Sequence, residues 1–152
     1  MVSPVSTTND LTLSIEQEIR VMAPLDVTFA ALLEELGPRH QVADDRPLPM
    51  KLEARPGGRW YRDLGDDNGH LWGHVQAIKR PTLLEINGPL FMSYAAVSNL
   101  QYRLTAIDGG TLITFRHTAI GMILEEHRAG VQDGWKYSHD RIRKAAESAA
   151  RR

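Results

Sequence analysis

The feature that most constrains the fold is a long region in which apolar and polar residues alternate. The alternation extends from residue 50 to residue 120, and turn-forming residues divide it into six segments. Alternation with a period of two is typical of strands that bury one face. Because Asp108-Gly109-Gly110 is a hairpin signal between the last two segments, we expect antiparallel pairing. The segments are residues 50–55, 59–64, 70–78, 82–87, 98–107 and 111–120.

A seventh strand and a helix precede this region. Residues 11–22 alternate like a long half-buried strand, and residues 24–36 carry apolar side chains at the spacing of one helical face. Gly37 followed by Pro38 ends that helix. The connection 38–49 is charged and contains prolines. Two interpretations of it stay open, an irregular segment and a short second helix.

Residues 122–150 form the last predicted element. Their apolar residues follow a lengthwise stripe that is typical of an amphipathic helix. Gly130 and Gly134 lie inside this stretch, and each costs about 1 kcal/mol relative to alanine in a helix. The two glycines therefore allow a break, in which case the regular helix begins near Val131 or Asp133.

The predicted order is strand, helix, six strands and a long helix, or β-α-β6-α. Strands followed by a helix indicate the α+β class, here a curved antiparallel sheet of about seven strands around a long C-terminal helix. The 152 residues are enough for one domain. We place this domain at residues 11–150, after a disordered or polar tail at residues 1–10. The tail has neither the basic start nor the apolar core of a signal peptide.

The composition excludes several classes of function. The absence of cysteine rules out disulfides, thiolate metal sites and cysteine nucleophiles, and it fits a reducing compartment. A net charge of −1 from mixed charges gives no sign of a nucleic-acid partner. No apolar run approaches the ~18 residues needed to cross a bilayer. We therefore expect a cytoplasmic protein with neither nucleic acid nor membrane as a partner.

Five stretches of the chain together resemble a known superfamily. They are residues 15–37, 54–65, 73–86, 102–121 and 130–135, the last of which reads GVQDGW. In this order they are similar to the START/Bet v 1-like (SRPBCC) superfamily, and most of all to its Hsp90-ATPase-activator-homologue-like branch, also labelled polyketide-cyclase-like. The resemblance spans nearly the whole chain and implies the helix-grip fold. It also implies a hydrophobic small molecule as partner and no cofactor, with catalysis in the same cavity in some members.

His70 and His74 flank Trp72, and their spacing raises the question of a metal site. On a strand the two histidines lie roughly 13 Å apart, too far for two bonds of ~2.0–2.1 Å to one zinc ion. We therefore expect no metal. Trp72 shares a face with both histidines, opposite the apolar face of Val75, unless a bulge near Gly73 exchanges the faces. A surface position and a cavity position for Trp72 both stay open.

Aromatic and methionine side chains are spread over strands, one loop and the last helix, as in the wall of an apolar pocket. A filled core would have the same composition. His117 follows Phe115 on an apolar face, and it is either a core histidine or a polar anchor that can act as acid or base. Catalytic residues cannot be assigned. The candidate ligand-binding residues are Trp60, Trp72, Phe91, Met92, Tyr102, Phe115, His117 and Trp135.

Three functions are compatible with the sequence. The first is binding of a hydrophobic small molecule in a cavity between the sheet and the C-terminal helix. The second is a cyclase- or lyase-type enzyme that uses this cavity, with His117 as acid or base and Tyr102 as hydrogen-bond donor. The third, a co-chaperone-like protein interaction, rests on the family name. The apolar stretch 88–99 is a lid, a dimer contact or a buried crossing, and homodimerisation is compatible with all three functions.

Overall fold

The computed structural model describes residues 11–152, so the tail at residues 1–10 lies outside the described residues. Within the described part, strands and helices follow in the order β1, α1, β2 to β9, α2. Their bounds are β1 Thr12–Val21, α1 Leu25–Leu36, β2 Gln41–Val42, β3 Arg46–Pro47, β4 Lys51–Leu52, β5 Arg59–Gly65, β6 Asn68–Lys79, β7 Leu83–Gly88, β8 Ala96–Ile107, β9 Gly110–Gly121 and α2 Glu125–Ala150.

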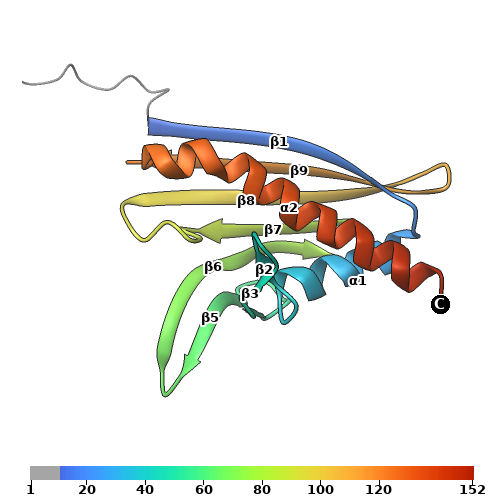
Figure 1. The fold of residues 1–152 in the computed structure, drawn as a ribbon, viewed down its shortest axis with the longest axis horizontal. Helices are drawn as coiled ribbons and strands as arrows, with labels where there is room; N and C mark the ends of the chain where they lie inside the picture. The colour runs from blue at the N-terminus through green and yellow to red at the C-terminus, as the bar shows by residue number, and fades with distance from the viewer. Residues whose placement is uncertain (1–10) are drawn as a thin grey trace, which may run out of the picture.

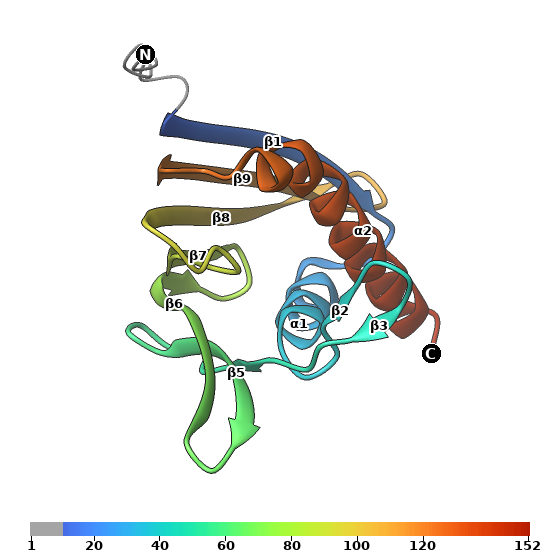
Figure 2. The ribbon, with the colours of Figure 1, turned by 60° about the vertical axis from the view of Figure 1, so that its left-hand side comes forward.

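Seven strands form one antiparallel sheet in the order β1-β9-β8-β7-β6-β5-β4. α2 runs along one face of this sheet, and α1 lies on the same side and packs against α2 (Figures 1 and 2). The sheet curves around the helices, and its edge strands β1 and β4 are not paired with each other. This arrangement confirms the predicted α+β helix-grip fold. Neither described helix combines the length and the apolar character needed to cross a membrane.

β1 and α1 form where the sequence pattern predicts them. β1 pairs along its whole length with β9, so the first strand of the chain lies beside the last one. In α1, Phe29, Leu32 and Leu36 are buried at helical spacing. Gly37 ends this helix, and its N–H group donates to the Leu33 carbonyl.

The connection after α1 is a small hairpin instead of a second helix. β2 pairs with β3, and Asp44 and Asp45 form the turn between them with φ angles of 65° and 56°. Aspartate tolerates this left-handed region better than most residues do. The Tyr137 hydroxyl of α2 donates to the Asp45 carboxylate at 2.6 Å. The hairpin is thereby held against α2, where it forms one side of the candidate site.

α2 is one continuous helix of 26 residues, so the break that Gly130 and Gly134 allow does not occur. Packing of its apolar stripe offsets the roughly 2 kcal/mol that two glycines cost in helix propensity. Both glycines are exposed, and a β-carbon added to either would meet no atom within 4 Å. The buried residues of the stripe are Val131, Trp135, His139, Ile142 and Ala146.

A bulge in β6 decides the position of Trp72. Two consecutive residues of β5 pair with Gly73 and Leu71, so Trp72 is the extra residue on β6. Trp72 and Val75 both point inward, with exposed fractions of 8% and 2%, while His74 is exposed. The bulge therefore exchanges the faces of this strand, and Trp72 lies on the inner face of the sheet together with Val75.

Candidate functional site

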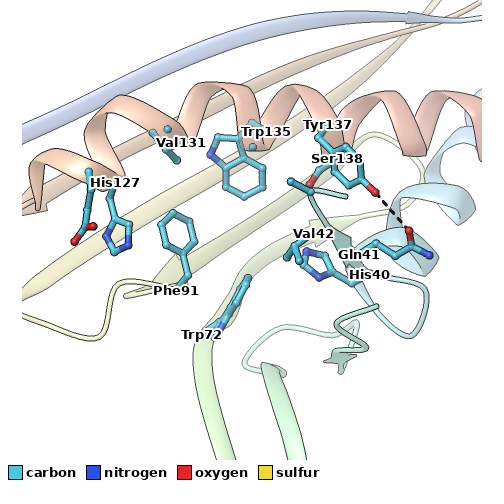
Figure 3. A pocket seen from close by; sticks show the side chains of 14 residues that line it. His40, Gln41, Val42, Trp72, Phe91, His127, Val131, Trp135, Tyr137 and Ser138 are labelled. Atoms are coloured by element: carbon cyan, nitrogen blue, oxygen red, sulfur yellow. Dashed lines mark hydrogen bonds between the residues drawn. The ribbon is translucent and has the colours of Figure 1, made fainter. Parts of the chain in front are cut away.

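A cavity of about 250 Å³ lies beneath the N-terminal half of α2 (Figure 3). Three other segments enclose it: the start of the β2–β3 hairpin, the bulge of β6, and the loop between β7 and β8. The side chains that carry most of its surface are apolar or aromatic. They are Val42, Trp72, Phe91, Val131 and Trp135, together with the imidazoles of His40 and His127.

A continuous row of aromatic rings forms a second wall of the cavity. The His127 ring lies 5.3 Å from Phe91, Phe91 lies 6.0 Å from Trp72, and Trp72 lies 5.8 Å from His40, measured between centroids. Each contact is edge-to-face, an arrangement that aromatic pairs prefer. The row therefore runs from α2, across the sheet, to the β2–β3 hairpin, with one histidine at each end.

The helix side of the cavity is formed partly by bare backbone. Gly130 and Gly134 are one turn apart and face the cavity beside Val131 and Trp135. Since a β-carbon at either glycine would meet open space, the missing side chains leave volume free without leaving a packing defect. The two glycines thus widen the cavity on its helix side.

The loop between β7 and β8 is a buried crossing that supplies part of the wall. Leu90 and Met92 are fully buried, and Phe91 between them faces the cavity. Leu90 has a φ angle of 59°, and its N–H group donates to the Trp72 carbonyl at 2.8 Å. Of the three interpretations of the stretch 88–99, this burial favours the crossing. A dimer contact there stays a prediction.

Tyr94 fastens this loop to the beginning of α2. Its hydroxyl oxygen accepts the Leu124 N–H at 3.2 Å and lies 2.8 Å from Nδ1 of His127. The Tyr94 and His127 rings are stacked, with an angle of 13° between their planes. The first turn of α2 and the cavity wall are therefore held together by one side chain.

Behind Trp135, aromatic side chains fill the space between the sheet and the second half of α2. Measured between ring centroids, Phe115 lies 4.9 Å from Trp135, 4.8 Å from Tyr102 and 4.3 Å from His139. The Tyr102 hydroxyl is 3.0 Å from Nε2 of His139, and burial raises the pKa of this hydroxyl. Side chains thus occupy the region directly between sheet and helix, and the cavity lies beside it.

His117 belongs to this filled region. The indole N–H of Trp135 donates to its Nδ1 at 3.0 Å, and Ser98 Oγ lies 2.9 Å from its Nε2. An indole can only donate, so Nδ1 of His117 carries no proton and the imidazole is neutral. Burial lowers the pKa of His117 to about 4. Both ring nitrogens are engaged inside the core, which leaves neither available to a molecule in the cavity.

The structure brings three of the eight predicted ligand-binding residues to the cavity, namely Trp72, Phe91 and Trp135. The other five are fully buried and do not line it. Their direct role in binding stays a prediction, and their observed role is to pack the walls from behind. These five are Trp60, Met92, Tyr102, Phe115 and His117.

The cavity residues that the sequence did not predict include His40, His127, Gly130 and Gly134. His40 lies in the charged connection after α1, where no periodicity points to a buried face. The glycines carried a usable signal, because they are four residues apart and each directly precedes a residue of the buried stripe. Paired glycines at the border of an apolar helix face indicate a close approach or a space, as well as a break.

His70 and His74 play no part in a shared site. Nδ1 of His70 accepts the indole N–H of Trp72 at 3.1 Å, and His74 is exposed on the outer face of β6. Among residues 11–152, no three histidine, aspartate or glutamate side chains gather as a group that could hold a metal ion.

Comparison with known proteins identifies the family. The sequence model of the Activator of Hsp90 ATPase homolog 1-like proteins matches residues 23–147. The chain belongs to this family. The matched part extends from the start of α1 almost to the end of α2, so every element that lines the cavity lies inside the family's domain. No curated protein matches the sequence.

Solved structures similar to this family member confirm the predicted START/Bet v 1-like fold. An uncharacterised protein from Rhizobium leguminosarum is 18% identical, with a TM-score of 0.70 over 90% of this chain and 95% of its own. Ara h 8.0201 is 17% identical, with a TM-score of 0.65 over 90% of this chain and 99% of its own. The di-domain ARO/CYC protein StfQ from the steffimycin biosynthetic pathway is 13% identical, with a TM-score of 0.64 over 95% of this chain and 52% of its own. At these identities the likeness concerns the fold alone.

Proposed function

We propose that this protein binds a hydrophobic small molecule in the cavity beneath α2. The observation that carries the proposal is a cavity with aromatic walls whose helix side includes two glycines. Ligand sites are mostly apolar, with a few well-positioned polar groups, and typically measure about 300–1,000 Å³. At about 250 Å³, the cavity suits a compact ligand of two or three rings better than an extended lipid chain.

The ligand site lies beside the location that the sequence predicts. Tyr102, Phe115 and Trp135 are packed together, so side chains fill the space between strands β8 and β9 and the middle of α2. The ligand binds instead between the first half of α2 and the aromatic row, on the open side of the Trp135 ring. The ARO/CYC protein StfQ belongs to the steffimycin biosynthetic pathway by its name, which supports a small-molecule role on this fold.

The test of this function uses the fluorescent apolar probe N-phenyl-1-naphthylamine with two leucine variants of α2. Gly134→Leu introduces a side chain into the cavity, and Ala129→Leu makes a similar change at an exposed position of the same helix that does not line it. Because a buried leucine displaces ligand contacts worth about 1.5–3 kcal/mol, we expect Gly134→Leu to weaken binding at least ~tenfold. Ala129→Leu should bind like the wild type.

Two readouts separate loss of the site from loss of the fold. Leucine is a far better helix former than glycine, so Gly134→Leu should unfold at a temperature equal to or above that of the wild type. Mass spectrometry of an organic extract of the purified protein gives an independent view of any bound molecule. Equal probe affinity in Gly134→Leu and the wild type would refute binding in this cavity.

A further inference from the structure

One histidine at the edge of the cavity presents a free acceptor. Nδ1 of His40 lies 3.1 Å from the Leu48 carbonyl. A carbonyl can only accept, so Nδ1 carries the proton, and in the neutral ring Nε2 is left with a lone pair. His40 is only 6% exposed, and burial lowers its pKa, which keeps the ring neutral. No residue of the described chain bonds to this Nε2.

The histidine at the other end presents a donor. The Tyr94 hydroxyl already accepts the Leu124 N–H, so its own proton is available for Nδ1 of His127 at 2.8 Å. In the tautomer in which Nδ1 of His127 accepts this proton, the ring proton resides on Nε2. Within residues 11–152, this N–H also lacks a partner.

The aromatic side chains between the two histidines offer carbon only, and the other polar side chains that line the cavity belong to Gln41, Glu126, Tyr137 and Ser138. The indole N–H of Trp72 is bonded to His70, and that of Trp135 is bonded to His117. Phe91 has no polar group. In Figure 3, His127 and His40 lie on opposite sides of Phe91 and Trp72, and the ring-to-ring contacts put them at the two ends of the aromatic row. Within the aromatic row, free polar groups are therefore confined to the two ends.

We infer that the cavity takes a flat aromatic molecule with a hydroxyl group at one end, which donates to Nε2 of His40, and a carbonyl group at the other, which accepts from Nε2 of His127. This inference rests on the proposed function and specifies its ligand. A site with a fixed acceptor and a fixed donor discriminates against analogues that lack the matching group, because a partner is then left without its hydrogen bond.

The test uses three fluorescent probes of similar size at pH 7. 7-Hydroxycoumarin has a hydroxyl and a carbonyl at opposite ends, 7-methoxycoumarin lacks the donor, and 2-naphthol lacks the carbonyl. One net hydrogen bond is worth about 0.5–1.5 kcal/mol, or roughly two- to tenfold in affinity. We expect the wild type to bind 7-hydroxycoumarin several-fold more tightly than either of the other two.

Matched variants assign each end of the probe to one histidine. An asparagine amide can occupy the position of Nδ1, so His40→Asn can keep the bond to Leu48, and His127→Asn can keep the acceptor for Tyr94, while each loses Nε2. His40→Asn should erase the advantage of 7-hydroxycoumarin over 7-methoxycoumarin. His127→Asn should weaken both coumarins and spare 2-naphthol. His74→Asn, at an exposed position away from the cavity, should change nothing.

The outcomes separate this inference from the function on which it rests. Equal affinity of the wild type for all three probes, or equal losses for all probes in both variants, overturns the inference and leaves hydrophobic binding intact. Absence of binding by all three probes overturns the inference as well. If the affinity for N-phenyl-1-naphthylamine is also unchanged in Gly134→Leu, the proposed function is refuted together with the inference.

Discussion

Acid should destabilise this protein through two histidines of its core. His117 and His139 are 0% and 2% exposed, and all of their ring nitrogens contact uncharged groups. Nδ1 of His139 lies 2.7 Å from Oε1 of Gln17, and its Nε2 lies 3.0 Å from the Tyr102 hydroxyl. A proton added to His117 would point at the indole N–H of Trp135, because both groups would then be donors. Burial accordingly lowers the pKa of His117 to about 4 and that of His139 to about 3.

The sign and size of the effect follow from these values. In the unfolded chain the two histidines titrate near the ordinary histidine pKa of 6.5. Below that pH they bind protons in the unfolded chain but not in the folded one. The stabilisation is complete above the unfolded pKa and is lost as the pH falls toward the folded one. Between pH 7 and pH 5, each histidine should lower the free energy of unfolding by about 2 kcal/mol, and both together by about 4 kcal/mol. That is a large part of the ~5–15 kcal/mol by which domains are stable.

Urea denaturation at pH 7, 6 and 5, followed by tryptophan fluorescence, measures this loss. In His117→Asn, the amide oxygen can still accept from Trp135, and the side chain does not titrate. We expect its loss of stability between pH 7 and pH 5 to be smaller than that of the wild type by about 2 kcal/mol. The contributions of carboxylates and of other histidines are shared by both proteins and cancel in the comparison.

His74→Asn is the control, because His74 is exposed on the outer face of β6. Its pH dependence should match that of the wild type. If His117→Asn loses as much stability on acidification as the wild type does, then His117 binds a proton in the folded state about as easily as in the unfolded one. The described network of Trp135, His117 and Ser98 would then not hold the ring neutral.

Three further changes probe the walls of the cavity. Gly130→Ala should raise the free energy of unfolding by about 1 kcal/mol in urea, because a β-carbon there meets no atom within 4 Å; a decrease would mean that the helix face is not open. Trp60→Phe removes a fully buried indole whose N–H donates to the Leu36 carbonyl at 2.8 Å. It should cost about 2–4 kcal/mol in the same assay, and a cost near zero would contradict that bond. Tyr94→Phe deletes the acceptor of the Leu124 N–H, so hydrogen exchange of that amide should accelerate, and unchanged exchange would argue against the link between loop and helix.

The fold could be predicted from the sequence because its strands bury one face and therefore alternate. The hairpin at Asp108-Gly109-Gly110 and the strands on either side of it were confirmed almost to the residue. The continuity of α2 through Gly130 and Gly134 could not be predicted from propensity, since tertiary packing of the neighbouring stripe decides it.

The site was predictable only in part. Aromatic composition drew attention to Trp72, Phe91 and Trp135, which line the cavity, but the same reasoning selected residues such as Phe115 that fill the core behind it. Periodicity cannot distinguish residues that line the cavity from residues that pack behind them, because both are buried. The inward position of Trp72 depends on a single extra residue in β6, and a bulge of this kind has no reliable signal in one sequence.

The pairing of β1 with β9 has a consequence for synthesis on the ribosome. Thr12 lies opposite Ile120 and Val21 lies opposite Thr111, so the first strand emerges long before its neighbour exists. Until β9 leaves the exit tunnel, the backbone of β1 lacks the strand with which it pairs in the described sheet. Native structure cannot therefore accumulate strand by strand from β1 onward, and completion of the sheet must wait until β9 has been translated.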